Sequence, residues 1–180
     1  NAIQENNYPA KYQTFYPVKV NQQRQVVEAI TKFGKKYEIG LEVGSKPELV
    51  AAISLSTGNG LPIICNGYKD TDFIETILYA TKIGYDITIV VEKLFELEKI
   101  IGLVEKTGIK PKLGIRVKLS SKGTGKWATS GGEDAKFGLR ISELIAAIEI
   151  LKENELLDSL GLLHFHIGSQ ITKIDKIKSA

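Results

Sequence analysis

The sequence predicts an α/β fold, a partial TIM-type (β/α) barrel of about six parallel strands with flanking helices. Short apolar runs alternate with longer segments of helical period, which is typical of βαβ units around a parallel sheet. One run, Ile87–Val91, is nearly all apolar and β-branched, as expected for a strand covered on both faces. Because six strands are too few for a complete eight-stranded barrel, the prediction is an incomplete one, and an open doubly wound sheet is the alternative.

Six runs are candidate strands. In chain order they are Gln13–Val20, Ile39–Val43, Pro62–Cys65, Asp86–Val91, Lys112–Val117 and Leu160–His166. The segments between them carry apolar residues three or four positions apart, as on one face of a helix. Examples are Leu49 with Ile53, Phe73 with Ile77, Leu97 with Ile101, and Leu144 with Ile148. No literal repeat or low-complexity linker divides the chain, so one domain is predicted over residues 1–180.

Side chains that can cap a helix mark several predicted helix starts. Ser45 with Glu48 three residues later has the spacing of a capping box. Asp70 and Ser142 are expected to cap two later helices, because their side-chain oxygens can accept from the free N–H groups of a first turn.

Composition excludes several classes of protein. The chain has 180 residues, of which 43% are hydrophobic and 25% charged, which describes a soluble globular chain with a real core. The net charge is only +3 and the lysines are scattered, so no nucleic-acid partner is indicated. No apolar stretch approaches the roughly 18 residues of a membrane span, so no membrane partner is expected. The single Cys65 and the polar first residues favour a reducing compartment, with the cytoplasm as the expectation.

Polar residues stand at the predicted carboxyl ends of several strands, where parallel α/β folds place their working residues. Because these ends meet on one face of the sheet, we expect the side chains to converge. They are Lys19, Glu42, Asn66, Tyr68, Arg116, His164 and His166.

Lys19 lies inside an otherwise apolar run, Tyr16–Asn21. It is either a solvated lysine on an edge strand, which Pro17 favours, or a desolvated amine. Burial lowers the pKa of a lysine, and a neutral amine can attack a carbonyl and hold an aldehyde cofactor as a Schiff base. These residues alone leave both interpretations open.

Both histidines of the chain lie in His164–Gln170, and strand alternation sends His164 and His166 to the same side. They are either a hydrogen-bonded core pair or site residues. Zinc is not indicated, because the one cysteine is distant and no second metal-ligand spacing is present.

A long segment, Lys118–Lys136, is predicted as a loop and contains Gly123-Thr124-Gly125-Lys126-Trp127. It is not a P-loop, because the required spacing is absent and Trp127 stands where Ser or Thr should be. Loops of this length are either binding elements, lids and interfaces or surface insertions, and both interpretations stay open.

Taken together, these segments resemble the biosynthetic arginine decarboxylases, pyridoxal-phosphate enzymes of the alanine racemase and ornithine decarboxylase fold group. The resemblance runs along essentially the whole chain. Its carriers are Tyr16–Gln22, Gly40–Lys46, Cys65–Asp70, Gly123–Trp127 with Ser130–Glu133, Lys136–Leu139 and His164–Gln170.

The resemblance implies decarboxylation of L-arginine to agmatine and carbon dioxide, the first step of a polyamine route, through an aldimine of pyridoxal 5'-phosphate. It implies that Lys19 carries the cofactor, that His166 lies against the pyridine ring and that Ser169 lies near the phosphate. Glu42 and Arg116 would orient the cofactor and its partners beneath the ring.

The resemblance also implies an assembly and further segments. Lys136 would lie at the boundary between subunits of a homo-oligomer, a dimer or dimer of dimers. Magnesium is commonly assigned to the family, although this sequence offers no carboxylate cluster for it. The family's glycine-rich phosphate loop, the acid at the pyridine nitrogen and its β-domain would lie beyond Ala180, so we expect an inactive fragment. A non-catalytic regulator or a single-domain cofactor carrier is the alternative.

Overall fold

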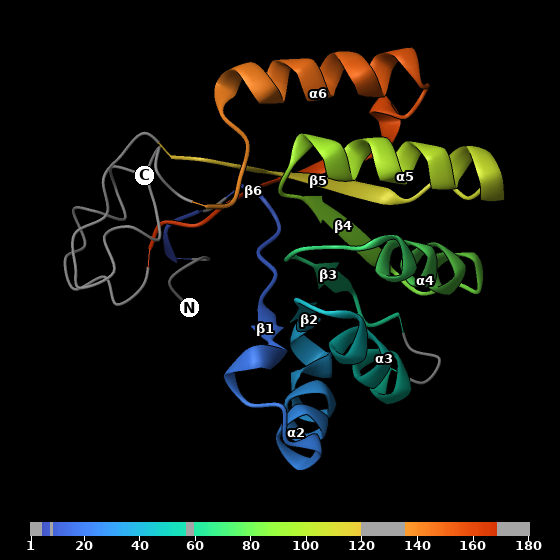
Figure 1. Ribbon diagram of the computed structural model, residues 1–180. Coiled ribbons are helices and arrows are strands. Elements are labelled where there is room, and N and C mark those ends of the chain that lie inside the picture. The colour runs from blue at the N-terminus through green and yellow to red at the C-terminus, as the bar shows by residue number, and fades with distance from the viewer. Residues whose placement is uncertain (1–4, 8, 57–59, 120–135, 169–180) are drawn as a thin grey trace.

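One parallel sheet forms the centre of the molecule, and its strands lie side by side in the order of the chain (Figure 1). The computed structural model describes residues 5–7, 9–56, 60–119 and 136–168. The strands are β1 (Phe15–Pro17), β2 (Gly40–Val43), β3 (Ile63–Cys65), β4 (Ile87–Val91), β5 (Lys112–Val117) and β6 (Leu160–Phe165). Every neighbouring pair is parallel.

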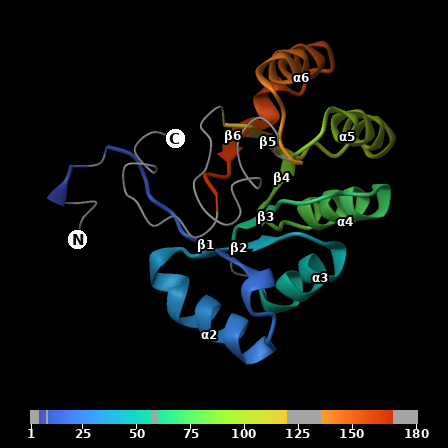
Figure 2. The same cartoon turned by 60° about the vertical axis from the view of Figure 1, so that its left-hand side comes forward.

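Helices connect the strands and lie along one side of the curved sheet, as Figure 2 shows. They are α2 (Arg24–Gly34), α3 (Lys46–Leu55), α4 (Thr71–Lys82), α5 (Leu94–Thr107) and α6 (Ile141–Glu153), with short 3-10 turns η1 (Val18–Val20), η2 (Lys35–Tyr37) and η4 (Leu157–Ser159). A doubly wound sheet would reverse its strand order and carry helices on both faces. The partial barrel is therefore confirmed and the doubly wound alternative is wrong, while β1 and β6 remain its open edges.

The core is centred on β4 and the helices that pack against it. Ile89 and Val90 are neighbours and so point to opposite faces of the sheet, yet neither is exposed. The prediction that this strand is covered on both faces is confirmed. Ile74, Ile77 and Leu78 of α4 are also fully buried, and each such side chain contributes about 1.5–3 kcal/mol.

Two predicted strands end earlier in the structure. The first, Gln13–Val20, ends at Pro17, and the chain continues as the 3-10 turn η1. Pro17 lacks an N–H for the ladder, and Lys19 lies in the turn instead of in the strand. The sixth, Leu160–His166, ends at Phe165, so His166 lies just beyond the strand.

The helix starts follow the predictions in part. The Ser45 hydroxyl accepts from the backbone N–H of Glu48 at 3.4 Å, but the Glu48 carboxylate accepts from Gly44 at 2.7 Å instead of from Ser45. Only half of the predicted capping box forms. Asp70 does cap α4, because its carboxylate accepts from the N–H of Phe73 at 2.8 Å.

The predicted cap at Ser142 is wrong. Helix α6 begins at Ile141, so Ser142 already lies in its first turn. Arg140 is the cap residue, and its backbone N–H donates to the Glu143 carboxylate at 2.8 Å. The acceptor for this N–H is the Glu143 side chain within the helix, and the helix starts two residues earlier than a Ser142 cap would place it.

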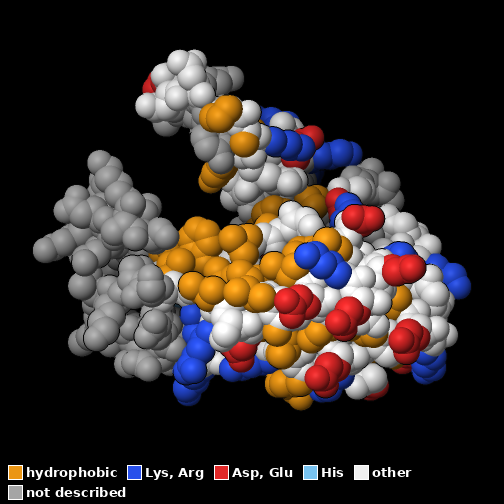
Figure 3. Space-filling model, turned by 90° about the horizontal axis from the view of Figure 1, so that it is seen from above, with side chains coloured by type: hydrophobic (Ala, Val, Ile, Leu, Met, Phe, Trp, Pro, Cys, Tyr) orange, Lys and Arg blue, Asp and Glu red, His pale blue; other side chains and the backbone are white. Residues whose placement is uncertain are grey.

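The surface carries acidic and basic side chains in alternation with small apolar patches, as the view onto α6 shows (Figure 3). No large patch of only positive or only negative side chains covers this face, in keeping with the net charge of +3. Within the described ranges, none of the helices combines the length and the hydrophobicity that crossing a bilayer requires.

Candidate functional site

Four polar side chains form a line of contacts inside the curve of the sheet. Lys19 Nζ lies 3.5 Å from Glu42 Oε1, and Asn66 Nδ2 donates to the same oxygen at 3.5 Å. Asn66 Nδ2 also lies 3.5 Å from His164 Nε2. In a flat sheet β3 and β6 would be about 14 Å apart, at roughly 4.8 Å per strand. This contact is therefore made across the concave side, where the strand ends converge.

The charges of the same cluster shift the pKa of both histidines. Burial lowers the pKa of His164, and the positive charge of Arg116 lowers it further. Burial and Arg116 also lower the pKa of His166, with a smaller contribution from Lys19, while Glu42 opposes the shift. Both imidazoles are therefore neutral near pH 7.

Arg116 is fixed by a buried acid that the sequence analysis missed. Arg116 Nη1 donates to Glu92 Oε1 at 2.5 Å, and the Glu92 side chain is only 1% exposed. Arg116 itself is 13% exposed and lies 5.7 Å from the centre of the Phe137 ring. Glu92 directly follows β4, so the same strand-end argument that selected Arg116 could have found it.

A second missed pair, Lys69 and Glu96, lies behind the cluster. Lys69 is completely buried and its Nζ lies 3.4 Å from Glu96 Oε2. The Glu96 carboxylate also accepts from the backbone N–H groups of Lys69 and Glu92. Lysine and glutamate are almost never fully buried unless they are paired, which is why sequence pattern alone does not indicate this site.

The remaining sequence predictions have different outcomes. Lys19 is 66% exposed and is therefore not a desolvated amine, because η1 places it beyond the end of an edge strand. Tyr68 packs beside Phe95 and Lys99 instead of joining the cluster. Ser169 and residues 120–135, with Gly123–Trp127, lie outside the described residues.

The two ends of the long loop meet beside the cluster. The backbone N–H of Leu139 donates to the Arg116 carbonyl at 2.8 Å, and that of Lys118 donates to the Leu139 carbonyl at 2.9 Å. Lys136, three residues before Leu139, is exposed. The loop therefore leaves from and returns to the carboxyl end of β5.

Cys65 ends β3 but is not available for chemistry. Burial raises the pKa of its thiol to about 12, although the charge of Lys69 acts in the opposite direction. A thiol with this pKa is protonated near neutral pH and is a poor nucleophile.

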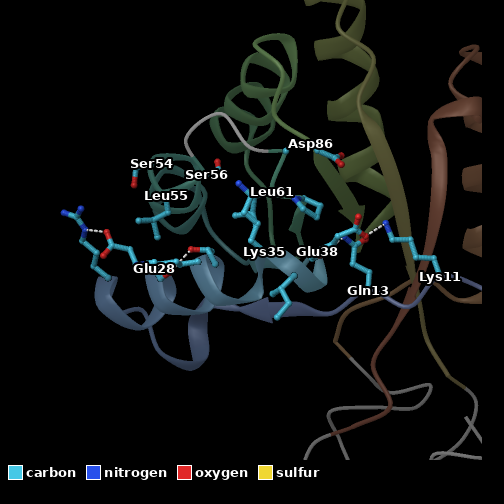
Figure 4. Close-up of a pocket in the computed structure, with 16 residues that line it drawn as sticks. Lys11, Gln13, Glu28, Lys35, Glu38, Ser54, Leu55, Ser56, Leu61 and Asp86 are labelled. Atoms are coloured by element: carbon cyan, nitrogen blue, oxygen red, sulfur yellow. Dashed lines mark hydrogen bonds and ion pairs between the residues drawn. The ribbon is translucent and has the colours of Figure 1, made fainter. Parts of the chain in front are cut away.

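A groove of about 910 Å³ lies at the opposite, amino end of the strands (Figure 4). It is broad and polar, and two ion pairs join residues that line it: Lys11 with Glu38, and Arg24 with Glu28 at 2.6 Å. This groove lies away from the carboxyl strand ends that converge around Asn66.

Whether the cluster suits a cofactor depends on its unpaired atoms and donors. Asn66 Oδ1, Glu92 Oε2 and His164 Nδ1 are buried and lack a hydrogen-bond partner among the described residues. Beside them are an accessible lysine amine and neutral imidazoles, which suit an aldehyde cofactor with an aromatic ring. In the described part of the chain, no group of three or more His, Cys, Asp or Glu side chains could hold a metal ion.

Comparison with curated proteins finds close relatives over the whole chain. The biosynthetic arginine decarboxylase of Geobacter sulfurreducens is 86% identical over 180 residues, and that of Geobacter sp. strain M21 is 82% identical over 180 residues. Both alignments cover 100% of this chain and 28% of the relative. The chain thus spans little more than a quarter of the length of these proteins.

Solved structures agree with the fold. The biosynthetic arginine decarboxylase of Campylobacter jejuni superposes with a TM-score of 0.87 at 41% identity, over 99% of this chain and 28% of that one. The diaminopimelate decarboxylase of Helicobacter pylori gives 0.76 at 22% identity, over 97% of this chain and 43% of that one, a likeness of fold alone.

A family model decides the assignment. The model of the pyridoxal-dependent decarboxylases, pyridoxal binding domain, matches residues 2–180. This match spans all the strands and the complete line of contacts from Lys19 to His164. The chain therefore belongs to the pyridoxal-dependent decarboxylases, within the family that forms their pyridoxal binding domain.

Proposed function

We propose that this chain is the cofactor-binding part of a longer arginine decarboxylase, which converts L-arginine to agmatine and carbon dioxide. The single observation that carries the proposal is the accessible Lys19 amine beside Glu42, on the concave face where the strand ends meet. Its support comes from relatives that are named biosynthetic arginine decarboxylases and are 82% and 86% identical. The proposal places the enzyme in the cytoplasm at the start of a polyamine route, and recovery from the cytosolic fraction tests that location.

In this proposal, the Lys19 amine would hold pyridoxal 5'-phosphate through its aldehyde group until the amino group of the substrate takes its place. Bound pyridoxal phosphate supplies an electron-poor ring that stabilises the negative charge left when carbon dioxide departs. Glu42, 3.5 Å from Lys19 Nζ, holds the ammonium when Lys19 is free and provides an acceptor for its proton. Lys19 is thus kept at the reacting position between turnovers.

His166 and Arg116 have orienting roles in the proposal. The lowered pKa of His166 keeps its imidazole neutral, so that its flat face can lie against the pyridine ring without adding a charge. Arg116 is held by Glu92 and would present a positive charge that helps to orient the cofactor. Ser169, outside the described residues, would contribute its hydroxyl to the phosphate.

Magnesium remains an expectation from the family resemblance, and no role above depends on it. Adding a chelator to the purified enzyme tests it directly. Unchanged activity after removal of the metal would dismiss a magnesium requirement.

The test is an assay of the purified full-length protein with pyridoxal phosphate and three substrates. We expect arginine to give agmatine and carbon dioxide with the highest kcat/KM, ahead of ornithine and diaminopimelate. A preference for either of the other substrates would reject arginine as the substrate. Cofactor binding without any decarboxylation would favour a carrier or a non-catalytic regulator.

We also propose that the enzyme is a homo-oligomer with Lys136 at the subunit boundary. Lys136 is exposed in the isolated chain, and it adjoins Phe137, whose ring lies near Arg116. An exposed ion pair contributes only about 0–1 kcal/mol, so a strong effect requires burial against a partner. Sedimentation of Lys136→Ala should show a weakened dimer with reduced activity, and a fully active monomer would contradict this assignment.

A further inference from the structure

The Glu96 carboxylate joins the loops that follow two different strands. It accepts from the backbone N–H of Lys69, after β3, at 3.3 Å. It accepts from the backbone N–H of Glu92, after β4, at 2.8 Å. It also pairs with Lys69 Nζ at 3.4 Å. Three donors from two loops thus converge on one carboxylate that is only 1% exposed.

Lys69 extends this connection to the loop that carries Asn66. Its ammonium donates to the Gly67 carbonyl oxygen as well as to Glu96. Gly67 has a φ of +128°, and a Cβ on it would lie 2.8 Å from the Gly44 carbonyl oxygen. The loop is therefore pressed against the β2–α3 connection in a conformation that favours glycine. Lys69 stabilises this conformation and with it the place of Asn66.

Glu92 extends the connection in the other direction. Its backbone N–H is fixed by Glu96, and its carboxylate holds Arg116. Its carbonyl oxygen accepts from the N–H of Gly138, where the long loop returns, at 3.2 Å. A shift of Glu96 would consequently move the anchor of Arg116.

We propose that the buried Lys69–Glu96 ion pair is a positioning unit that sets Asn66 and Arg116 in their places around the cofactor site. The side chains of Lys69 and Glu96 are 0% and 1% exposed, so neither is accessible to a cofactor. The inference rests on the proposed function. A purely structural pair could be replaced by uncharged side chains of similar volume without loss of stability or activity. If the pair positions the site, the same replacement should still impair cofactor binding and kcat after stability is restored.

The test compares single and double substitutions in the full-length enzyme. Lys69→Met and Glu96→Gln each leave a buried charge without its partner, so both should lower Tm strongly. The double variant contains neither charge and should regain most of the lost Tm. We nevertheless expect its kcat at saturating pyridoxal phosphate to stay about 10- to 100-fold low, the cost of a small misplacement of reacting groups.

A readout that does not depend on turnover accompanies the assay. Titration of the apoenzyme with pyridoxal phosphate should show weaker binding and an altered absorption maximum of the bound cofactor in the double variant. A double variant with wild-type kcat, affinity and spectrum would overturn the proposal and make the pair merely structural.

Two further variants keep the test decisive. If the double variant does not fold, Glu96→Asp keeps the charge but withdraws the carboxylate by one methylene, and it should show the same spectral change. An unaltered spectrum and kcat would again overturn the proposal. The matched control is Lys106→Met with Glu75→Gln, an exposed pair joining α5 and α4 at 3.3 Å, which should leave every readout unchanged.

The two hypotheses can fail separately. If the wild-type enzyme binds pyridoxal phosphate but does not decarboxylate arginine, the proposed function fails. The affinity and spectrum of the bound cofactor then still decide whether Lys69 and Glu96 position the site.

Discussion

The lysine beside the middle of the sheet and the lysine beside its edge differ in solvent exposure. Lys69, after the central strand β3, is completely buried and held by Glu96 and a backbone carbonyl. Lys19, after the edge strand β1, is 66% exposed and has one carboxylate at 3.5 Å. The same type of side chain is thus fixed in one place and accessible in the other.

This difference separates a lysine that supports the site from a lysine that can react. A lysine whose ammonium is enclosed by acceptors cannot approach an external carbonyl, whereas an accessible amine can. The central loops therefore form a rigid frame, and the reactive group lies at the edge of that frame. Glu42 and Asn66 connect the two regions, since they link Lys19 to the loop that Lys69 holds.

The largest effect should come from removing the accessible lysine. In the full-length enzyme, Lys19→Met should lower kcat by roughly 10³-fold or more, the scale expected when a catalytic nucleophile is removed. The control is Lys46→Met, which removes another exposed lysine with a distant partner, Asp72 at 3.9 Å. Equal activity of the two variants in a carbon dioxide release assay would remove Lys19 from the mechanism.

The second effect concerns the stability of the frame. Glu92→Gln takes the buried partner from Arg116 and should cost about 3 kcal/mol in the free energy of unfolding. Asp86→Asn breaks an exposed ion pair with Lys112 at 2.7 Å and should cost about 0–1 kcal/mol. Urea denaturation measures both, and similar losses would show that the buried and exposed pairs do not differ.

The smallest effect is electrostatic and has opposite signs for two variants. Arg116 lowers the pKa of His164 and His166, and Glu42 raises it. Arg116→Gln should therefore raise both pKa values toward 6.5, and Glu42→Gln should lower them further. NMR titration of the imidazole protons checks this, and shifts of the same sign in both variants would contradict the shared cluster.

The same pKa shifts predict how stability depends on pH. Because folding lowers the histidine pKa values, the unfolded state binds more protons than the folded state below about pH 6.5. The free energy of unfolding should consequently fall as the pH drops through this range. The effect fades above pH 7, as the histidines become neutral in both states.

The sequence was sufficient for those features that depend on local pattern. Apolar β-branched runs identified β4, and the strand-end argument brought Glu42, Asn66, Arg116 and His164 to one face. The exposure of Lys19 was one of two interpretations that the sequence left open, because the choice depends on where Pro17 ends the strand and on β1 lying at an edge.

The buried pair could not be predicted in the same way. Charged residues are normally solvated, and the partnership of Lys69 with Glu96 depends on a loop and the first turn of α5, 27 residues apart, meeting in space. Glu92 is different, because it directly follows an apolar strand and only the choice of strand ends left it out.

The most direct test of the account is to find which lysine carries the cofactor. The full-length protein is loaded with pyridoxal phosphate, reduced with borohydride, digested and mapped by mass spectrometry. The account predicts that the label lies on Lys19 and that Lys69 remains unmodified. A label on Lys69, Lys46 or Lys136, with Lys19 free, would contradict the division between a buried frame and a reactive edge.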